Sequence, residues 1–316
     1  GMARPELAHS PATRLENACA SGSAALYAAL DFIDAGRGDI AVVAGVEKMT
    51  ALPTAEVGDV LLGACYREEE DDIEGGFAGL FGQIAQKYFQ QHGDQSDALA
   101  MIAAKNHANG VHNPYAHMQK AFSFEQCSAV TDKNPYVAPP LRRTDCSLIS
   151  DGAAAIVVAS AAVAATLGKS LAFRARMARR DPTECDGARR AGAGALEAAG
   201  LTLDDLDFVE THDCFTIAEL IEYEAMGLAA PGRGADVIRD GTTARDGRLP
   251  VNLSGGLKSK GHPIGATGVS MHVMSAMQLA GEAPEGMQAA KADIGAVFNM
   301  GGAAVANYCS ILERKS

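Results

Sequence analysis

Asn17-Ala18-Cys19-Ala20-Ser21-Gly22-Ser23 is followed by an apolar run, 24–36, with the periodicity of a helix. The residues before it, 12–16, are typical of a short extended segment, so Cys19 is predicted at a strand-to-helix turn. There the unpaired N–H groups and the positive end of the helix dipole favour a thiolate, the nucleophilic form of cysteine. On these residues alone, a buried structural cysteine at a helix start is an equal alternative.

The order of elements in the first half recurs in the second. In the first half the sequence predicts a small-residue turn at 17–23, a helix at 24–36, and strands at 39–45 and 153–159. In the second half it predicts a turn at 252–268, a helix at 269–280, and strands at 293–298 and 303–308. This repetition predicts an α/β protein made of two duplicated halves, 1–162 and 163–316, with mostly apolar strands covered on both faces.

The first half carries a long insertion, 52–144, which predicts a cap or lid over a ligand. Its histidines, His107, His112 and His117, are spaced five apart and do not share one face of a helix. No metal site is predicted from them.

The two halves differ at their starts. About eighty residues, 171–251, precede the Gly-rich turn of the second half, whereas eighteen precede Cys19. We therefore expect the first half to lack a β-α-β piece and to form an incomplete sheet, unless the start was assigned too late or another chain fills the gap.

Composition limits the function classes. A net charge of −12 over 316 residues argues against non-specific binding to nucleic acid or to an anionic membrane. Seven irregularly spaced cysteines form neither a disulfide framework nor a metal motif, so reduced thiols are expected. With no apolar stretch of membrane-spanning length and no leader pattern, the sequence favours a cytoplasmic protein.

A polar stretch, Thr211-His212-Asp213-Cys214-Phe215-Thr216, follows a predicted strand at 207–210. Open α/β sheets place ligands at the carboxyl ends of their strands. His212 could donate to an oxyanion and Cys214 could carry a proton. The alternative is a capped helix start, with Asp213 or Thr211 as the cap.

The Gly-rich loop 252–268 requires a backbone that passes close to something, and we predict that Ser254, Gly255 and Gly256 contact a ligand there. His262, followed by a proline, is a candidate base or donor. Lys258 and Lys260 are expected at the surface or against phosphates at the rim of the loop. A hinge without function is the alternative.

A third turn, Asn299-Met300-Gly301-Gly302-Ala303, again follows a strand. Its backbone N–H groups could form an oxyanion pocket, although a simple strand bend gives the same pattern.

Together the motifs Asn-x-Cys-x-Ser-Gly, His-Asp-Cys-Phe and Gly-His-Pro-Ile-Gly-Ala-Thr-Gly resemble those of the thiolases, most closely the sterol-carrier-protein type. Two further stretches, 45–49 (Gly-Val-Glu-Lys-Met) and 150–155 (Ser-Asp-Gly-Ala-Ala-Ala), agree with that resemblance, which covers essentially the whole chain. It implies layered α-β-α-β-α halves, a cap that binds coenzyme A, and a homodimer or tetramer.

The resemblance also implies roles for the site residues. Cys19 would accept an acyl group, His262 would activate its thiol, and His212 would complete one oxyanion hole. The N–H groups of Cys19 and Gly301 would form the second hole. Most thiolases carry an acid/base cysteine in a Cys-x-Gly motif, where this chain has Asn299-Met300-Gly301, so Cys214 would take over that role.

The activity implied is acyl transfer: thiolysis of a 3-ketoacyl-CoA, or the reverse condensation. Coenzyme A would be a co-substrate, with no permanently bound cofactor. A retro-aldol lyase is one alternative. Another is a non-catalytic acyl-CoA-binding subunit, in some relatives dependent on a small OB-fold or zinc-ribbon partner.

Overall fold

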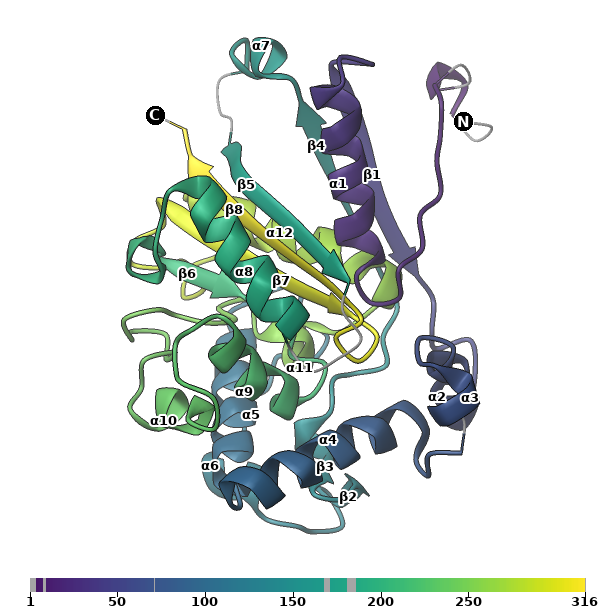
Figure 1. Ribbon diagram of the computed structural model, residues 1–316, viewed down its shortest axis with the longest axis vertical. Helices are drawn as coiled ribbons and strands as arrows, with labels where there is room; N and C mark the ends of the chain where they lie inside the picture. Colours follow the sequence, from purple (N-terminus) through teal and green to yellow (C-terminus); the bar gives the residue numbers. More distant parts are fainter. Residues whose placement is uncertain (1–3, 8–9, 71, 168–170, 181–185, 316) are drawn as a thin grey trace.

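The computed structural model describes residues 4–7, 10–70, 72–167, 171–180 and 186–315. It is a mixed α/β structure in which two sheets lie on either side of a helix pair, with a largely helical cap to one side (Figure 1). The first half contributes α1 (Ser21–Asp34), β1 (Ile40–Glu47), β4 (Gly152–Ala159) and α7 (Ala161–Ala164). The second half contributes β5 (Leu171–Arg180), α8 (Asp186–Ala199), β6 (Phe208–Glu210), α9 (Thr216–Ala225), α10 (Gly234–Arg239), α11 (Gly256–Lys260), α12 (Ile264–Ala280), β7 (Ile294–Gly301) and β8 (Ala306–Arg314).

The two sheets have different sizes. In the second half the strand order is β5-β8-β7-β6, with β6 parallel to β7 and the other pairs antiparallel. One face of this sheet packs on α8 and the other on α12. In the first half, β1 and β4 form a two-stranded antiparallel sheet that packs on α1 and α12.

The outer face of the β1–β4 sheet is open among the described residues. Alternate apolar side chains point away from α1 and α12; Val42, Val46 and Val157 are 66%, 70% and 64% exposed. The expectation that strands would be covered on both faces is therefore wrong for this sheet. Of the five layers implied by the resemblance, the described residues form four: α8, the four-stranded sheet, the pair α1 and α12, and the β1–β4 sheet. Whether a β-α-β piece is missing from the front of the chain stays a prediction.

The central helices α1 and α12 cross at a pair of glycines. A Cβ atom on Gly22 would lie 2.5 Å from the backbone nitrogen of Val269, and one on Gly268 would lie 2.3 Å from that of Ser23. Each glycine thus lets the opposite backbone approach more closely than a side chain would permit. This crossing fixes the starts of both helices, and hence the two loops that precede them, relative to one another.

The predicted insertion forms the cap. Its helices and strands are α2 (Thr54–Leu62), α3 (Arg67–Glu70), α4 (Gly76–His92), α5 (Ser96–Gly110), α6 (Phe124–Ser128), β2 (Tyr136–Ala138) and β3 (Leu141–Arg142). Helices α4 and α5 pack on α9, and α5 also packs on α11. The cap is thereby joined to the second half, although it interrupts the first half in sequence. Among the described residues no helix is long and apolar enough to cross a membrane.

Candidate active site

Cys19 lies in a tight turn directly before α1, and its side chain is buried (3% exposed). Ala18 adopts a left-handed conformation (φ 48°), and the side chain of Asn17 donates to the hydroxyl of Tyr308 at 2.7 Å. The preceding residues, 11–16, belong to no strand, so the predicted strand-to-helix turn is wrong on its strand side. The turn is instead anchored to β8 of the second half.

The ionisation of Cys19 also differs from expectation. Burial raises the pKa of the thiol to about 12, although a backbone hydrogen bond from Gly302 acts in the opposite direction. Desolvation of the charged sulfur outweighs the helix terminus, which we expected to favour the thiolate. The resting group is therefore a thiol.

The His-Asp-Cys-Phe segment alternates between two environments. His212 and Cys214 lie beside Cys19, which raises the pKa of Cys214 further after burial has already raised it. Asp213 points the other way, where its carboxylate accepts from the N–H groups of Leu257 and Lys258 at the start of α11. Phe215 stacks on Phe81 of the cap at 4.5 Å. An extended backbone produces this alternation, so one short segment supplies the site and anchors both a loop and the cap.

The loop of His262 is held from the first half. The backbone N–H of His262 donates to the hydroxyl of Ser150 at 2.7 Å. Pro263 packs on Gly152 so closely that a Cβ atom on Gly152 would lie 2.7 Å from Cγ of Pro263. On β1, the carboxylate of Glu47 accepts from the N–H of Gly265 at 3.1 Å. The stretches 45–49 and 150–155, quoted above only for their resemblance, therefore position a site residue.

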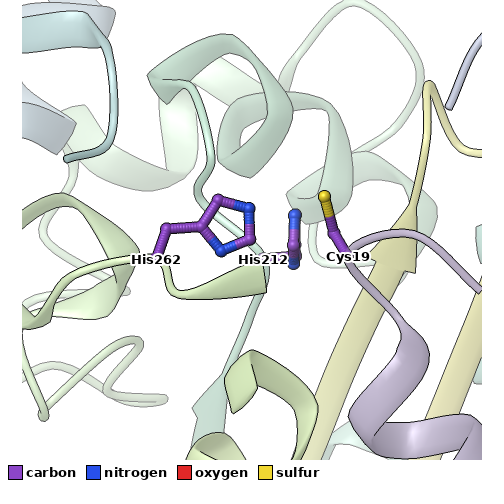
Figure 2. Close-up of side chains that lie close together, drawn as sticks. All are labelled: Cys19, His212 and His262. Carbon is purple, nitrogen blue, oxygen red and sulfur yellow. The ribbon is translucent and has the colours of Figure 1, made fainter. Parts of the chain in front are cut away.

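Three side chains predicted from separate motifs meet in one place. Ligand-type atoms of Cys19, His212 and His262 all lie within 4.8 Å of one another, and all three residues are buried. The two imidazole rings are 5.1 Å apart and nearly perpendicular. Figure 2 shows His212 edge-on between His262 and the Cys19 sulfur. Among the described residues this is the one such trio, and it combines a nucleophile with two groups able to move protons.

Both histidines are neutral at physiological pH. Burial lowers the pKa of His262 to about 3, helped by the nearby charge of Lys260, and lowers that of His212 well below its usual value. Nδ1 of His262 lies 2.7 Å from the hydroxyl of Thr267, which itself donates to the carbonyl of Pro263 at 3.0 Å. Because that hydroxyl has one proton, its oxygen accepts from Nδ1, and Nε2 of His262 keeps a free lone pair.

The turn at the end of β7 lies beside Cys19, and its role as an oxyanion pocket stays a prediction. Gly301 lines the cavity that contains Cys19, and a Cβ at this position would lie 2.6 Å from the carbonyl of Asn17. The backbone of Gly302, in a left-handed conformation (φ 63°), is the group that acts to lower the pKa of the Cys19 thiol. Sequence reasoning quoted Gly302 within this turn but assigned the donor role to Gly301 alone.

The residues predicted to bind a ligand in the Gly-rich loop do not reach the cavity. The hydroxyl of Ser254 donates to Glu210 at 2.5 Å, while Cβ atoms on Gly255 and Gly256 would lie 2.5 Å from Gly110 and 2.3 Å from Asp213. The glycines permit a close approach, but the neighbour is the protein itself. This correction removes all three from the cavity wall.

The two lysines of that loop are not at the surface. Lys258 and Lys260 are 1% and 6% exposed; Lys258 donates to the carbonyl of Cys146, and Lys260 to the hydroxyl of Ser270 at 2.8 Å. Burial lowers the pKa of both. Neither is placed to meet a phosphate at the rim.

A cavity of about 1170 Å³ opens onto two members of the trio, Cys19 and His262. Its wall includes Cys19, Cys214 and His262, together with α2 and the start of α4 from the cap. The site thus lies where the two halves and the cap meet, and its volume exceeds that of most small-molecule pockets.

Sequence reasoning also missed residues that orient the trio, in particular Ser150, Thr267 and Asn299. Ser150 and Thr267 lie in stretches that were quoted only for their resemblance, and a hydroxyl side chain does not indicate which group it binds. Asn299 was visible only as a departure from the Cys-x-Gly motif. Its amide lies 3.0 Å from Nδ1 of His212.

Comparison with known proteins agrees with this geometry. The thiolase N-terminal domain matches residues 4–133, and the thiolase C-terminal domain-like family matches 168–314. An acetyl-CoA acetyltransferase of Methanothermobacter thermautotrophicus is 38% identical over 306 residues, covering 92% of this chain and 77% of the relative. The benzoylsuccinyl-CoA thiolase subunit BbsB of Thauera aromatica is 33% identical (87% and 72% covered), and human sterol carrier protein 2 is 32% identical (86% and 53% covered).

Solved structures show the same fold at low sequence identity. The Ltp2-ChsH2(DUF35) aldolase superposes with a TM-score of 0.79 at 19% identity, covering 94% of this chain and 78% of that one. A monomeric SCP2-thiolase like protein type 1 from Mycobacterium smegmatis gives 0.71 at 19% identity, covering 95% and 62%. The resemblance drawn from the sequence motifs is confirmed, and the chain belongs to the thiolase family.

Proposed function

We propose that this protein is an acyl-CoA acyltransferase that cleaves 3-ketoacyl-CoA with coenzyme A, or runs the reverse condensation, through an acyl-Cys19 intermediate. The observation that carries the proposal is the convergence of Cys19, His212 and His262 at a cavity between the two halves. The cavity's volume of about 1170 Å³ leaves room for an acyl chain and part of the pantetheine arm.

The first half-reaction uses the free lone pair of His262. Nε2 of His262 takes the proton from the Cys19 thiol as the sulfur attacks the 3-keto carbon of the substrate. The C2–C3 bond then breaks, leaving an acyl group on Cys19 and the enolate of an acyl-CoA. Since the thiol pKa is about 12 and the imidazole pKa about 3, proton transfer accompanies attack rather than preceding it.

The second half-reaction regenerates the enzyme. Before it begins, the thiol of Cys214, which burial keeps protonated, gives its proton to the enolate carbon, and this first product leaves as acetyl- or propionyl-CoA while the shortened acyl chain stays on Cys19. Coenzyme A then attacks acyl-Cys19, its thiol proton passing to Cys214, and the proton held on His262 returns to the Cys19 sulfur. In these steps the oxyanions accept hydrogen bonds from His212 and from the backbone N–H groups at Cys19 and Gly301–Gly302.

A mass-spectrometric test addresses the covalent step. The full chain is mixed with acetyl-CoA, quenched in acid and digested; the Cys19 peptide is expected to carry one acetyl group, and Cys19→Ala to carry none. In steady-state thiolysis of acetoacetyl-CoA, Cys19→Ala should lose at least about 10³-fold in kcat. Cys127→Ala removes a buried thiol of the cap that lies outside the cavity wall and should leave kcat unchanged.

The same experiment separates the alternative reading. A chain that binds acyl-CoA equally well before and after Cys19→Ala, without acetylation or turnover, would be an acyl-CoA-binding subunit. The BbsB relative is itself named as a subunit, so turnover that appears only after a second polypeptide is added would indicate a partner-dependent enzyme.

A further inference from the structure

Asn299 makes a set of contacts that fix the direction of its own amide. Its Nδ2 atom lies 3.3 Å from the carbonyl oxygen of Cys19 and 3.5 Å from that of Met300, both of which can only accept. On the other side, Oδ1 accepts from the hydroxyl of Ser23 at 2.7 Å. The atom next to the two carbonyls must therefore be the NH2 group.

The direction of the amide determines the tautomer of His212. The same Nδ2 lies 3.0 Å from Nδ1 of His212, and a donor faces this ring nitrogen only if the nitrogen accepts. The proton of the neutral ring is then on Nε2. We infer that Asn299 is a positioning residue, which holds His212 as the Nε2–H tautomer and so makes it the oxyanion donor of the proposed reaction.

The orphaned atom in the site fits this assignment. Nε2 of His212 is buried and has no hydrogen-bond partner, which is unusual for a polar group inside a protein. A buried N–H beside Cys19 and His262 gains a partner when a substrate oxygen binds there, and the hydrogen bond is strongest when that oxygen carries negative charge. With its proton on Nε2, His212 also has no lone pair there to offer a metal ion.

The two histidines of the trio are thus set to opposite tasks. Thr267 leaves His262 with a lone pair on Nε2, whereas Asn299 leaves His212 with a proton on Nε2. The acceptor and the donor are the same residue type in the same buried site. Only the partner of Nδ1 differs between them.

The test changes that partner from donor to acceptor. In Asn299→Asp, a carboxylate faces Nδ1 and draws the ring proton to it, so Nε2 loses its hydrogen. Histidine ¹⁵N spectra of the resting protein, with the His212 signals identified by their absence in His212→Asn, should show protonated Nε2 in the wild type and protonated Nδ1 in the variant. In thiolysis, kcat should fall by about 10²- to 10³-fold, the effect of one oxyanion donor, with KM changed little.

A matched control makes the same chemical change elsewhere. Asn307 is also buried (1% exposed), lies on the adjoining strand β8, and donates to the carbonyl of Ala304. Asn307→Asp should leave the His212 spectrum and the KM-to-kcat pattern as in the wild type. A general effect of burying a carboxylate would appear in both variants.

Two outcomes would overturn the inference: protonated Nδ1 on His212 in the wild type, or Asn299→Asp with the wild-type tautomer. Because the spectra are recorded without substrate, they decide the tautomer even if the proposed thiolase activity is absent. Conversely, an active enzyme with the other tautomer would refute the role of Asn299 and leave the proposed function standing.

Discussion

The two sheets contribute unequally to one site. The second-half sheet has four strands, is covered on both faces, and carries His212, Cys214 and Gly301 at or just beyond its strand ends. The first-half sheet has two strands and an open outer face, yet its half supplies Cys19. Cys19, the proposed nucleophile, therefore depends on the second half for its placement, through the helix crossing and the contacts to β7 and β8.

The helix crossing is the strongest of these dependences. In Gly268→Ala, the new Cβ would lie 2.3 Å from the Ser23 nitrogen and 2.7 Å from Oδ1 of Asn299. We expect a loss of about 3 kcal/mol in the free energy of unfolding, measured by urea denaturation. Misplacing Cys19 against the histidines should also cost about 100-fold or more in kcat.

Gly58→Ala in α2 is the control for stability, because its Cβ would meet nothing within 4 Å. This variant should be as stable as the wild type or slightly more so, since alanine favours helix over glycine. Wild-type stability and activity in Gly268→Ala would show that the halves are not held by this crossing.

The pKa of the Cys19 thiol allows a second comparison, between the helix terminus, which lowers it, and burial, which raises it. The pKa of Cys19 is about 12. At any pH well below this value, raising the pH by one unit increases the thiolate fraction of Cys19 tenfold. Alkylation by iodoacetamide, followed on the Cys19 peptide by mass spectrometry, should therefore accelerate about 100-fold between pH 7 and pH 9. Cys65, with a pKa of about 11, is the internal reference and should show the same slope at a higher rate. A rate that levels off above pH 7 would instead indicate a stabilised thiolate.

The open face of the first sheet can be tested with neighbouring valines. Val43 is 4% exposed and packs with Leu26 and Val269, whereas Val42 is 66% exposed on the opposite face. Val43→Ala should cost about 2 kcal/mol of stability in urea denaturation. Val42→Ala should change it by less than about 0.5 kcal/mol. Equal costs would mean that the outer face is covered in solution.

A single hydroxyl gives the smallest expected effect. Tyr27 on α1 donates to the carbonyl of Cys309 on β8 at 2.6 Å, linking the halves. Tyr27→Phe should lower the free energy of unfolding by about 1 kcal/mol. Tyr66→Phe, which removes an exposed hydroxyl bonded to Glu68, should have no measurable effect. Similar losses in both variants would refute the link.

Site residues that stand in a local sequence motif could be predicted, whereas their hydrogen-bond partners from distant segments could not. Cys19 and His262 were predicted as site residues because they stand in glycine-containing turns before helices, and His212 and Cys214 because they follow a strand. Ser254, Gly255 and Gly256 were misassigned because a glycine shows that something approaches closely, not whether it is a ligand or, as for Gly255, a neighbouring helix. The partners of the histidines depend on contacts between distant segments, such as Ser23 with Asn299.

The fold shows the same division. The repeated turn–helix–strand order predicted both central helices and most strands, because hydrophobic periodicity is local. The open face of β1–β4 was not predicted, since valines at alternate positions look the same whether the outer face is covered or bare. The strand expected at 12–16 failed because nothing in the sequence shows whether an extended segment finds a pairing partner.

The meeting of α1 and α12 has a consequence for folding. Cys19 precedes one of these helices and His262 the other, 243 residues apart, so neither half can assemble the trio alone. Contacts between residues so distant in sequence form late and slowly. A partly folded chain should therefore carry Cys19 without its histidine partners, and the proposed acyl transfer should be measurable only once both halves have docked.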